Sequence, residues 1–222
     1  MAIPAIGDLL DLSHTLAAPL FEGKRYPWEI LSTLKDFIRG LGASLPRKEY
    51  DEISPEVWVH KTAKIAPSAL IQGPTVIGAG TEVRHCAFIR GSALIGEGCV
   101  VGNSTEVKNA VIFDNVQVPH FNYVGDSVLG FRAHMGAGVI ASNFRSDKGN
   151  VNVHDGDAVI ETGLRKLGAI LGDGVDVGCN SVLCPGSVVG RDAVIYPLSR
   201  VRGFVPERSI LKGDGSVVPR KI

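Results

Sequence analysis

The chain has 222 residues, and its 23 Lys and Arg are balanced by 23 Asp and Glu, so its formal net charge is zero. This length suits one domain with a short appendage, and the neutral charge gives no overall attraction to nucleic acid or to an anionic membrane. Glycine reaches 27 residues while aromatic residues make up only 6%, which predicts short strands joined by tight turns. The start lacks the basic region of a signal peptide, and no apolar run reaches the ~20 residues of a membrane span. We therefore expect a cytoplasmic protein.

Residues 1–50 form the first segment, and their apolar residues have helical spacing. Helices are predicted around 8–12 and 28–38, and Gly40 or Gly42 suits the end of the second. We expect this segment to be a helical cap or linker that covers the first coil of the following domain, because a bare solenoid end exposes strand edges.

The next segment, residues 51–205, carries an aliphatic or aromatic residue at every sixth position, in two series. The first series comprises Val59, Ile65, Ile71, Ile77, Val83, Ile89, Ile95, Val101, Val107 and Phe113. The second comprises Leu171, Val177, Leu183, Val189, Ile195 and Val201. The two are out of phase, because 171 − 113 is 58, which is not a multiple of six. The segment between them must therefore interrupt the repeat.

A six-residue repeat argues against an α-helix, which would spread every sixth residue around its surface. A short strand followed by a sharp corner returns the same position to the interior each time, and this is the pattern of a β-helix solenoid. A β-sandwich with chance spacing is the alternative. The pattern resembles that of the left-handed parallel β-helix acyltransferases, whose coils take three hexads per turn. The expected fold class is therefore all-β, a single-stranded left-handed parallel β-helix with a short α-helical N-terminal segment.

The repeat is disturbed at 109–126 and again at 143–167. The second disturbance spans 25 residues, and a loop of that length without secondary structure is usually functional or disordered. We expect residues 144–167 to be a loop inserted into the solenoid. Residues 206–222 are expected to form a C-terminal tail.

Residues 120–126 read His-Phe-Asn-Tyr-Val-Gly-Asp. They resemble the His-x-x-Tyr-x-Gly-Asp segment in the acetyltransferase domain of the bifunctional glucosamine-1-phosphate acetyltransferase/N-acetylglucosamine-1-phosphate uridyltransferases. Val-Gly-Asn at 101–103 and Glu-Val-Lys-Asn-Ala at 106–110 resemble further motifs of that family. The run 161–169 is more similar to the archaeal-type sugar-phosphate nucleotidylyltransferase/acetyltransferase proteins. No Gly-rich nucleotide-binding loop precedes the domain, so we expect any nucleotide chemistry to lie on another polypeptide.

The resemblance implies an acetyl-CoA-dependent N-acetyltransferase that acts on an amino-sugar phosphate, with glucosamine-1-phosphate as the expected substrate. His120 matches the family's catalytic base, and an imidazole suits that role because it titrates near neutrality. Ala137 matches a residue whose backbone N–H faces the thioester oxygen, where negative charge develops.

The same resemblance implies which residues hold the sugar phosphate. Arg90 and Lys108 match the family's phosphate-binding cations, and Lys166 matches its loop lysine. Tyr123 matches a sugar-phosphate contact. His134 stands where the family has a sugar-contacting Asn, which would alter the preferred sugar.

The acetyl-CoA positions of the family fall on four residues of this chain. Asn143 matches an amide that bridges sugar and cofactor, and the N–H of Ala137 belongs to both sites. Cys179 and Pro197 match positions that line the coenzyme A groove, where the family commonly has Ser and Ala. The four cysteines of the chain have no Cys-x-x-Cys spacing, and we expect them to be reduced.

The family forms trimers with active sites between solenoids, so a homotrimer is expected, with residues 144–167 touching the neighbouring subunit. Two other functions stay open. One is a non-catalytic solenoid that binds nucleotide sugars or serves as a scaffold. The other is metal catalysis, because γ-type carbonic anhydrases share this solenoid; His85 and His120 are suitably placed, but position 125 is Gly, so we expect no catalytic metal.

Overall fold

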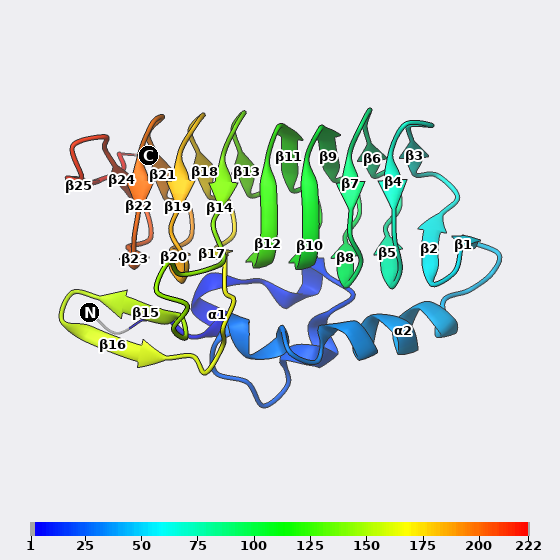
Figure 1. Ribbon diagram of the computed structural model, residues 1–222, viewed down its shortest axis with the longest axis horizontal. Coiled ribbons are helices and arrows are strands. Elements are labelled where there is room, and N and C mark those ends of the chain that lie inside the picture. Colours follow the sequence, from blue (N-terminus) through cyan, green and yellow to red (C-terminus); the bar gives the residue numbers. More distant parts are fainter. Residues whose placement is uncertain (1–2, 222) are drawn as a thin grey trace.

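The computed structural model describes residues 3–221 and is a parallel β-helix with a helical segment along one side (Figure 1). Its coils have three faces. The first face consists of β4 (Leu70–Ile71), β7 (Phe88–Ile89), the starts of β10 (Glu106–Ile112) and β12 (Tyr123–Leu129), β14 (Ile140–Ala141), β19 (Val182–Leu183) and β22 (Arg200–Val201). The second consists of β2 (Val57–His60), β5 (Thr75–Ile77), β8 (Ala93–Ile95), the ends of β10 and β12, β17 (Ala169–Leu171), β20 (Ser187–Val189) and β23 (Phe204–Val205). The third consists of β3 (Lys64–Ile65), β6 (Glu82–Val83), β9 (Val100–Asn103), β11 (Gln117–His120), β13 (His134–Met135), β18 (Asp176–Val177), β21 (Val194–Ile195) and β24 (Ser209–Leu211).

The expected β-helix is confirmed, and the six-residue series supplies its core. Ile77 pairs with Ile95 on the next coil, 18 residues later, so identical positions stack in columns. Most members of both series are buried, while Ile65 and Ile71 in the first coil are half-buried. Each such aliphatic side chain contributes roughly 1.5–3 kcal/mol when fully buried.

Two corners between the first and second faces, at 107–112 and 124–129, are one residue shorter than the six-residue spacing of the repeat. Counting in sixes reaches Phe113, but the ladder partner of Ile95 is Ile112. Phe113 is buried beside that column, so its place in the predicted series was wrong by one residue. The next coil repeats the shortening, because Leu129 is the partner of Ile112. As a result, β10 and β12 run through the corner without a break.

The inserted segment is an antiparallel hairpin rather than a loop without secondary structure. Its strands are β15 (Asn152–Asp155) and β16 (Ala158–Glu161), and a bridge between Phe144 and Lys166 closes its base. Val151 and Val153 are fully buried, and β15 packs against β20 and β23 of the solenoid. These two valines give the segment an apolar side that packs on the solenoid, which explains why it forms a defined hairpin. The insertion leaves the phase of the repeat unchanged, because Ala141 and Leu171 are 30 residues apart, a multiple of six. The phase change between the two series therefore comes from the two short corners alone.

The N-terminal segment lies along the second face and not across the first coil (Figure 1). It consists of α1 (Ile6–Leu9), η1 (Leu12–His14), η2 (Ala18–Phe21), η3 (Pro27–Ile30), α2 (Leu34–Ser44) and β1 (Tyr50–Ser54). Helix α2 contacts β5, β8 and β10, so its apolar stripe is buried against the side of the solenoid. The expected position over the first coil was therefore wrong, because the second face offers α2 a longer apolar surface. At the solenoid's start, β1 pairs antiparallel with β2.

The predicted helix over 28–38 is two elements, since η3 ends at Ile30 and α2 begins at Leu34. Helix α2 also continues past both glycines that were expected to end it. A Cβ on Gly42 would lie 2.1 Å from Cε3 of Trp58, so this glycine permits close packing of the helix on β2. At the other end, β24 extends the third face beyond residue 205, and β25 (Val217–Pro219) pairs antiparallel with it.

Candidate active site

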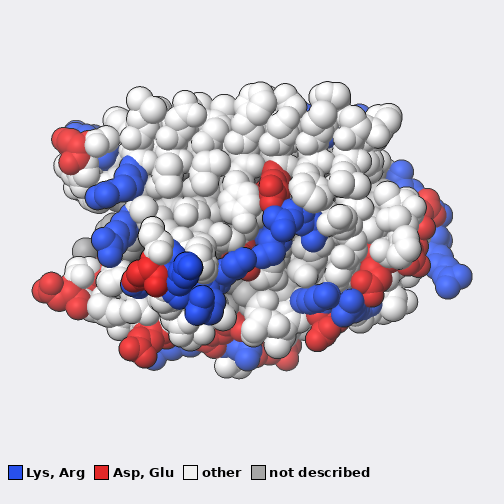
Figure 2. Space-filling view, in the orientation of Figure 1, with Lys and Arg blue, Asp and Glu red and all other residues white. Residues whose placement is uncertain are grey.

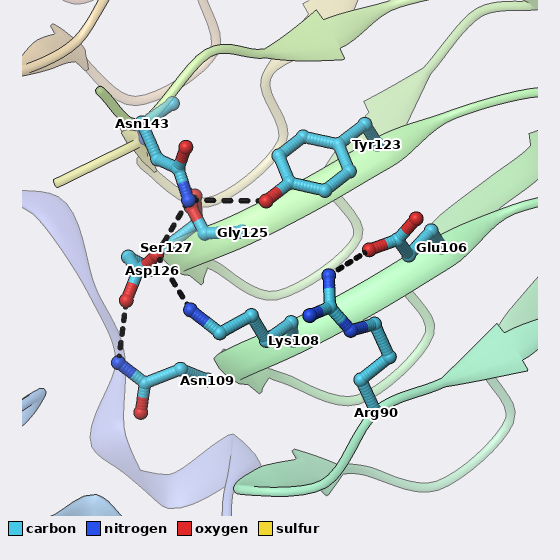
Figure 3. Close-up of polar contacts among 10 residues, drawn as sticks. Arg90, Glu106, Lys108, Asn109, Tyr123, Gly125, Asp126, Ser127 and Asn143 are labelled. Carbon is cyan, nitrogen blue, oxygen red and sulfur yellow. Dashed lines mark hydrogen bonds and ion pairs between the residues drawn. The ribbon is translucent and has the colours of Figure 1, made fainter. Parts of the chain in front are cut away.

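The two short corners hold the polar cluster of the molecule (Figure 3). Asn109 follows Lys108 in β10, and Asp126 occupies the equivalent place in β12 on the next coil. Both residues have positive φ, +47° and +51°, a conformation that Asn and Asp tolerate better than other side chains. The short corners thus direct polar side chains from successive coils to one place.

Asp126 is the centre of this cluster and is only 5% exposed. Asn109 Nδ2 donates to its Oδ1 at 2.8 Å, and Asn143 Nδ2 donates to its Oδ2 at 2.5 Å. Lys108 Nζ forms an ion pair with Oδ2 at 3.5 Å. A buried carboxylate needs such partners, and in return it fixes the side chains that surround it. Asp126 therefore positions Lys108 and Asn143, two residues that the sequence predicts as substrate contacts.

Tyr123 joins the cluster through Asn143, whose Nδ2 lies 3.1 Å from the tyrosine hydroxyl. Burial raises the pKa of the Tyr123 hydroxyl above its usual value, so it stays neutral at physiological pH. Gly125 lies directly beneath this pair. A Cβ there would be 2.5 Å from the Tyr123 hydroxyl and 2.7 Å from Asn143 Nδ2, so a larger residue would displace both groups.

Arg90 lies on the preceding coil, and its Nη1 pairs with Glu106 Oε1 at 2.6 Å. This ion pair raises the pKa of Arg90 and keeps the guanidinium charged. Glu106 comes from a strand of the next coil, which lies opposite Arg90. Its guanidinium carries further N–H groups beyond the one that faces Glu106.

His120 lies at the corner between the third and first faces, where Ala137, Cys179 and Pro197 follow it on successive coils. The residue after each has a positive φ, and its N–H bonds to the preceding coil. Thus Gly138 N donates to His120 O at 3.0 Å, and Asn180 N donates to Ala137 O at 2.8 Å. We call these four residues the His120 column. The structure therefore places all of the predicted base, oxyanion and groove positions in one line.

Two groups of the His120 column have no partner within residues 3–221. The exposed imidazole of His120 makes no side-chain hydrogen bond there, and the N–H of Ala137 meets no acceptor. The imidazole is thus free to accept a proton, and the N–H is free to donate to a ligand oxygen one coil away.

Lys166 and His134 differ in how they relate to the cluster. Lys166 sits at the base of the hairpin, opposite Phe144, and Leu167 N donates to Asn143 O at 3.1 Å. Lys166 is therefore next in sequence to a residue that bonds to Asn143, a member of the cluster. His134 instead lies on the third face, where its Nδ1 is 2.8 Å from Asp176 Oδ1, and the structure does not bring it to Tyr123 within one chain.

No family model matches the chain, but comparison with known proteins finds relatives of it. The bifunctional protein GlmU of Methanococcus maripaludis is 32% identical over 199 residues, which cover 88% of this chain and 48% of GlmU. A bifunctional sugar-1-phosphate nucleotidylyltransferase/acetyltransferase of Sulfurisphaera tokodaii is 40% identical over 111 residues, which cover 50% of this chain and 26% of that protein. YaiX of Escherichia coli, named as an uncharacterized acetyltransferase, is 35% identical over 156 residues, covering 70% of this chain and 68% of its own.

The chain belongs to the hexapeptide-repeat acyltransferases. It corresponds to the C-terminal acetyltransferase part of GlmU, as the sequence resemblance predicted, and it spans about half the length of that relative.

Three residues that hold the predicted site of this hexapeptide-repeat acyltransferase together were not predicted from the sequence. They are Glu106, Asn109 and Asp126. All three stand inside the motifs that carried the resemblance, but those motifs give no role to them. The signal that could have revealed them is the spacing of five residues, instead of six, between Val107 and Ile112, because this spacing makes the corner short.

The acyltransferase has other features that bear on its chemistry. Its four cysteines are free, and burial raises the pKa of the Cys99 thiol to about 12, whereas Cys86 and Cys179 are exposed. Within residues 3–221, no three His, Cys, Asp or Glu side chains gather closely enough to hold a metal ion. No helix in that range is long and apolar enough to span a membrane.

Proposed function

We propose that this acyltransferase transfers the acetyl group of acetyl-CoA to the amine of an amino-sugar phosphate, with glucosamine-1-phosphate as the substrate. The observation that carries the proposal is the free N–H of Ala137 next to the free imidazole of His120 in one column. The name of the Sulfurisphaera tokodaii relative, which couples a sugar-1-phosphate activity to an acetyltransferase, supports the substrate class.

In this reaction His120 accepts the proton that the substrate amine loses as its nitrogen attacks the thioester carbon. A C–N bond forms, and negative charge develops on the thioester oxygen, where the N–H of Ala137 stabilises it. The C–S bond then breaks, and the departing thiolate takes the proton from His120. Removal of one such oxyanion donor costs roughly 3 kcal/mol of transition-state stabilisation in other enzymes.

The polar cluster would hold the sugar phosphate. Lys108 and Arg90 are cations already fixed by carboxylates, so little side-chain entropy is lost when a phosphate binds. Tyr123 and Asn143 would contact the sugar, and Lys166 would reach the phosphate from the hairpin base. Figure 2 shows Lys and Arg side chains gathered across the middle of this side of the molecule.

Acetyl-CoA would lie along the His120 column, with Cys179 and Pro197 as the groove wall and Asn143 between the two substrates. Cys179 and Pro197 are both exposed, as such a wall requires. The cofactor's thioester would then end beside Ala137.

A homotrimer is proposed with this function. The second face is covered by the N-terminal segment, so a neighbouring copy would meet the first face and its corner with the third face. The band above the Lys and Arg cluster in Figure 2 is mostly uncharged. Exposed apolar side chains of the first face and of its corner with the third include Leu70 (55% exposed) and Leu198 (77% exposed). Such a patch suits a protein interface. Light scattering at micromolar concentration tests it, and a monomer would contradict the trimer.

The reaction itself is tested by release of free thiol from acetyl-CoA with a panel of amino-sugar phosphates. We expect thiol release with glucosamine-1-phosphate, together with a product heavier by one acetyl group. No release with any hexosamine phosphate, from folded protein, would refute the proposed function.

A further inference from the structure

The third face carries a depression that the proposed reaction does not use within one chain. Its volume is about 580 Å³, within the range of small-molecule sites. Its polar lining residues are Asn115, Gln117, Arg132, His134, Asp176 and Arg220. They come from three successive coil segments and from the end of the chain, which folds back over the solenoid beside β25.

Both arginines of the depression are held in place without an acidic partner. The guanidinium of Arg132 lies over the ring of Phe131, at 4.8 Å from its centroid, and that ring stacks on His14. Arg220 Nη1 donates to the backbone carbonyl of Asp192 at 2.7 Å. Within residues 3–221, neither guanidinium forms an ion pair. Most of their N–H donors therefore remain available to a ligand.

Asp176 is the acidic residue of this lining, and it is already engaged. Its Oδ1 lies 2.8 Å from His134 Nδ1, which also fixes the imidazole ring. The depression therefore holds two guanidinium groups that have no ion-pair partner among the described residues, with the side-chain amides of Asn115 and Gln117 as further donors. Guanidinium groups together with neutral donors suit a tetrahedral dianion, because a guanidinium can donate to two of its oxygens.

We propose that this depression, called the Arg132 site, binds the phosphate group of a small molecule. The proposal goes beyond the acetyl-transfer reaction, because it gives a role to Arg132 and Arg220 on a different face from Arg90 and Lys108. It does not depend on that reaction. A small ligand is favoured over a polyanion, because the chain as a whole is neutral.

Inorganic pyrophosphate is the probe that tests the Arg132 site, with its binding followed by isothermal titration calorimetry. The titrations use the Arg90→Gln, Lys108→Gln double variant as background, so that the cations of the candidate active site do not contribute. Adding Arg132→Gln and Arg220→Gln should weaken binding at least tenfold, because charge-assisted hydrogen bonds are lost. An affinity within twofold of the background protein, or no binding in that background, would overturn the proposal.

The matched control is Arg25→Gln, which also removes an exposed guanidinium that lies over a ring, that of Tyr26 at 5.3 Å. We expect this control to leave the affinity unchanged. Arg132→Lys keeps the charge and should retain part of the affinity, which separates a lost contact from a lost fold. An equal loss in the Arg25→Gln control would show a general charge effect and refute the site.

The phosphate could belong to the sugar substrate or to coenzyme A, and competition against bound pyrophosphate distinguishes these two sources. Displacement by glucosamine-1-phosphate assigns the Arg132 site to the sugar substrate, and displacement by adenosine 3′,5′-bisphosphate assigns it to coenzyme A. Displacement by neither would contradict a substrate phosphate. Because binding is measured without turnover, failure of acetyl transfer and failure of this site give different results.

Discussion

Asn109 Nδ2 donates to Asp126 Oδ1 at 2.8 Å, which joins two successive coils at their shortened corners. Asn143 donates to the other carboxylate oxygen from the third coil. One buried carboxylate thus links three coils at the point where the predicted phosphate-binding lysine also lies. The positions of Lys108 and Asn143, the proposed substrate contacts, therefore depend on Asp126, which itself would not touch the substrate.

Asp126→Asn tests this dependence. The new amide places an N–H₂ group against donors, so Lys108 and Asn143 should shift by an ångström or more, and such misplacement can cost about 10²-fold in rate. We expect the KM for the sugar phosphate to rise and the KM for acetyl-CoA to stay the same. Asp157→Asn in the exposed hairpin turn is the control. Equal changes in both KM values would indicate a general loss of structure instead.

Gly125→Ala tests the packing beneath Tyr123 and Asn143. The added methyl group would push the Tyr123 hydroxyl and the Asn143 amide out of place, and overpacking of this kind typically lowers the free energy of unfolding by about 1–3 kcal/mol. Gly213→Ala is the matched control, because a Cβ at that position meets nothing within 4 Å. Denaturant unfolding measures both variants. If the two variants were equally stable, the close approach of Tyr123 to Gly125 would not exist in solution.

The fold was largely predictable because a six-residue repeat has few structural solutions. Sixteen apolar positions in two series require a coil with corners, and only the column position of Phe113 failed. The failure arose because the corner at 107–112 has one residue fewer than the repeat, which moves the column from Phe113 to Ile112. Both residues are apolar, so the sequence pattern does not reveal the shift. Helix α2 was misjudged for a related reason, since the role of Gly42 depends on Trp58, a residue distant in sequence.

The candidate site was predictable only as a set of residue identities. The resemblance pointed to His120 and Lys108, but the carboxylates that fix the cations, Glu106 and Asp126, follow from the stacking of coils. The position of His134 on the third face likewise depends on how the strands are arranged around each coil. Contacts between coils join residues 16–18 positions apart, and no local pattern encodes them.

Alkylation of cysteines tests the proposed coenzyme A groove. Iodoacetamide at pH 8 should modify the exposed Cys86 and Cys179 but not Cys99, whose pKa of about 12 keeps it as a thiol. Coenzyme A should protect Cys179 and leave Cys86 reactive, as read by peptide mass spectrometry. Protection of both residues, or of neither, would contradict a groove along the His120 column.

The raised pKa of Tyr123 predicts a dependence on alkaline pH. An ultraviolet difference titration of the native protein against Tyr123→Phe should show this hydroxyl ionising above the usual pKa of about 10. Below that pH both states keep the proton. Above it the unfolded chain loses the proton first, so the free energy of unfolding should fall as pH rises toward the folded pKa. Ionisation below pH 10 would contradict the burial of this hydroxyl.

The central claim is that His120 is the base in acetyl transfer to an amino-sugar phosphate. Its most direct test compares the kcat for thiol release from acetyl-CoA, with glucosamine-1-phosphate as acceptor, between the native protein and His120→Ala. We predict a fall of about 10²–10⁴-fold, with coenzyme A binding retained. Equal rates in the two proteins, at equal folded content, would contradict the claim.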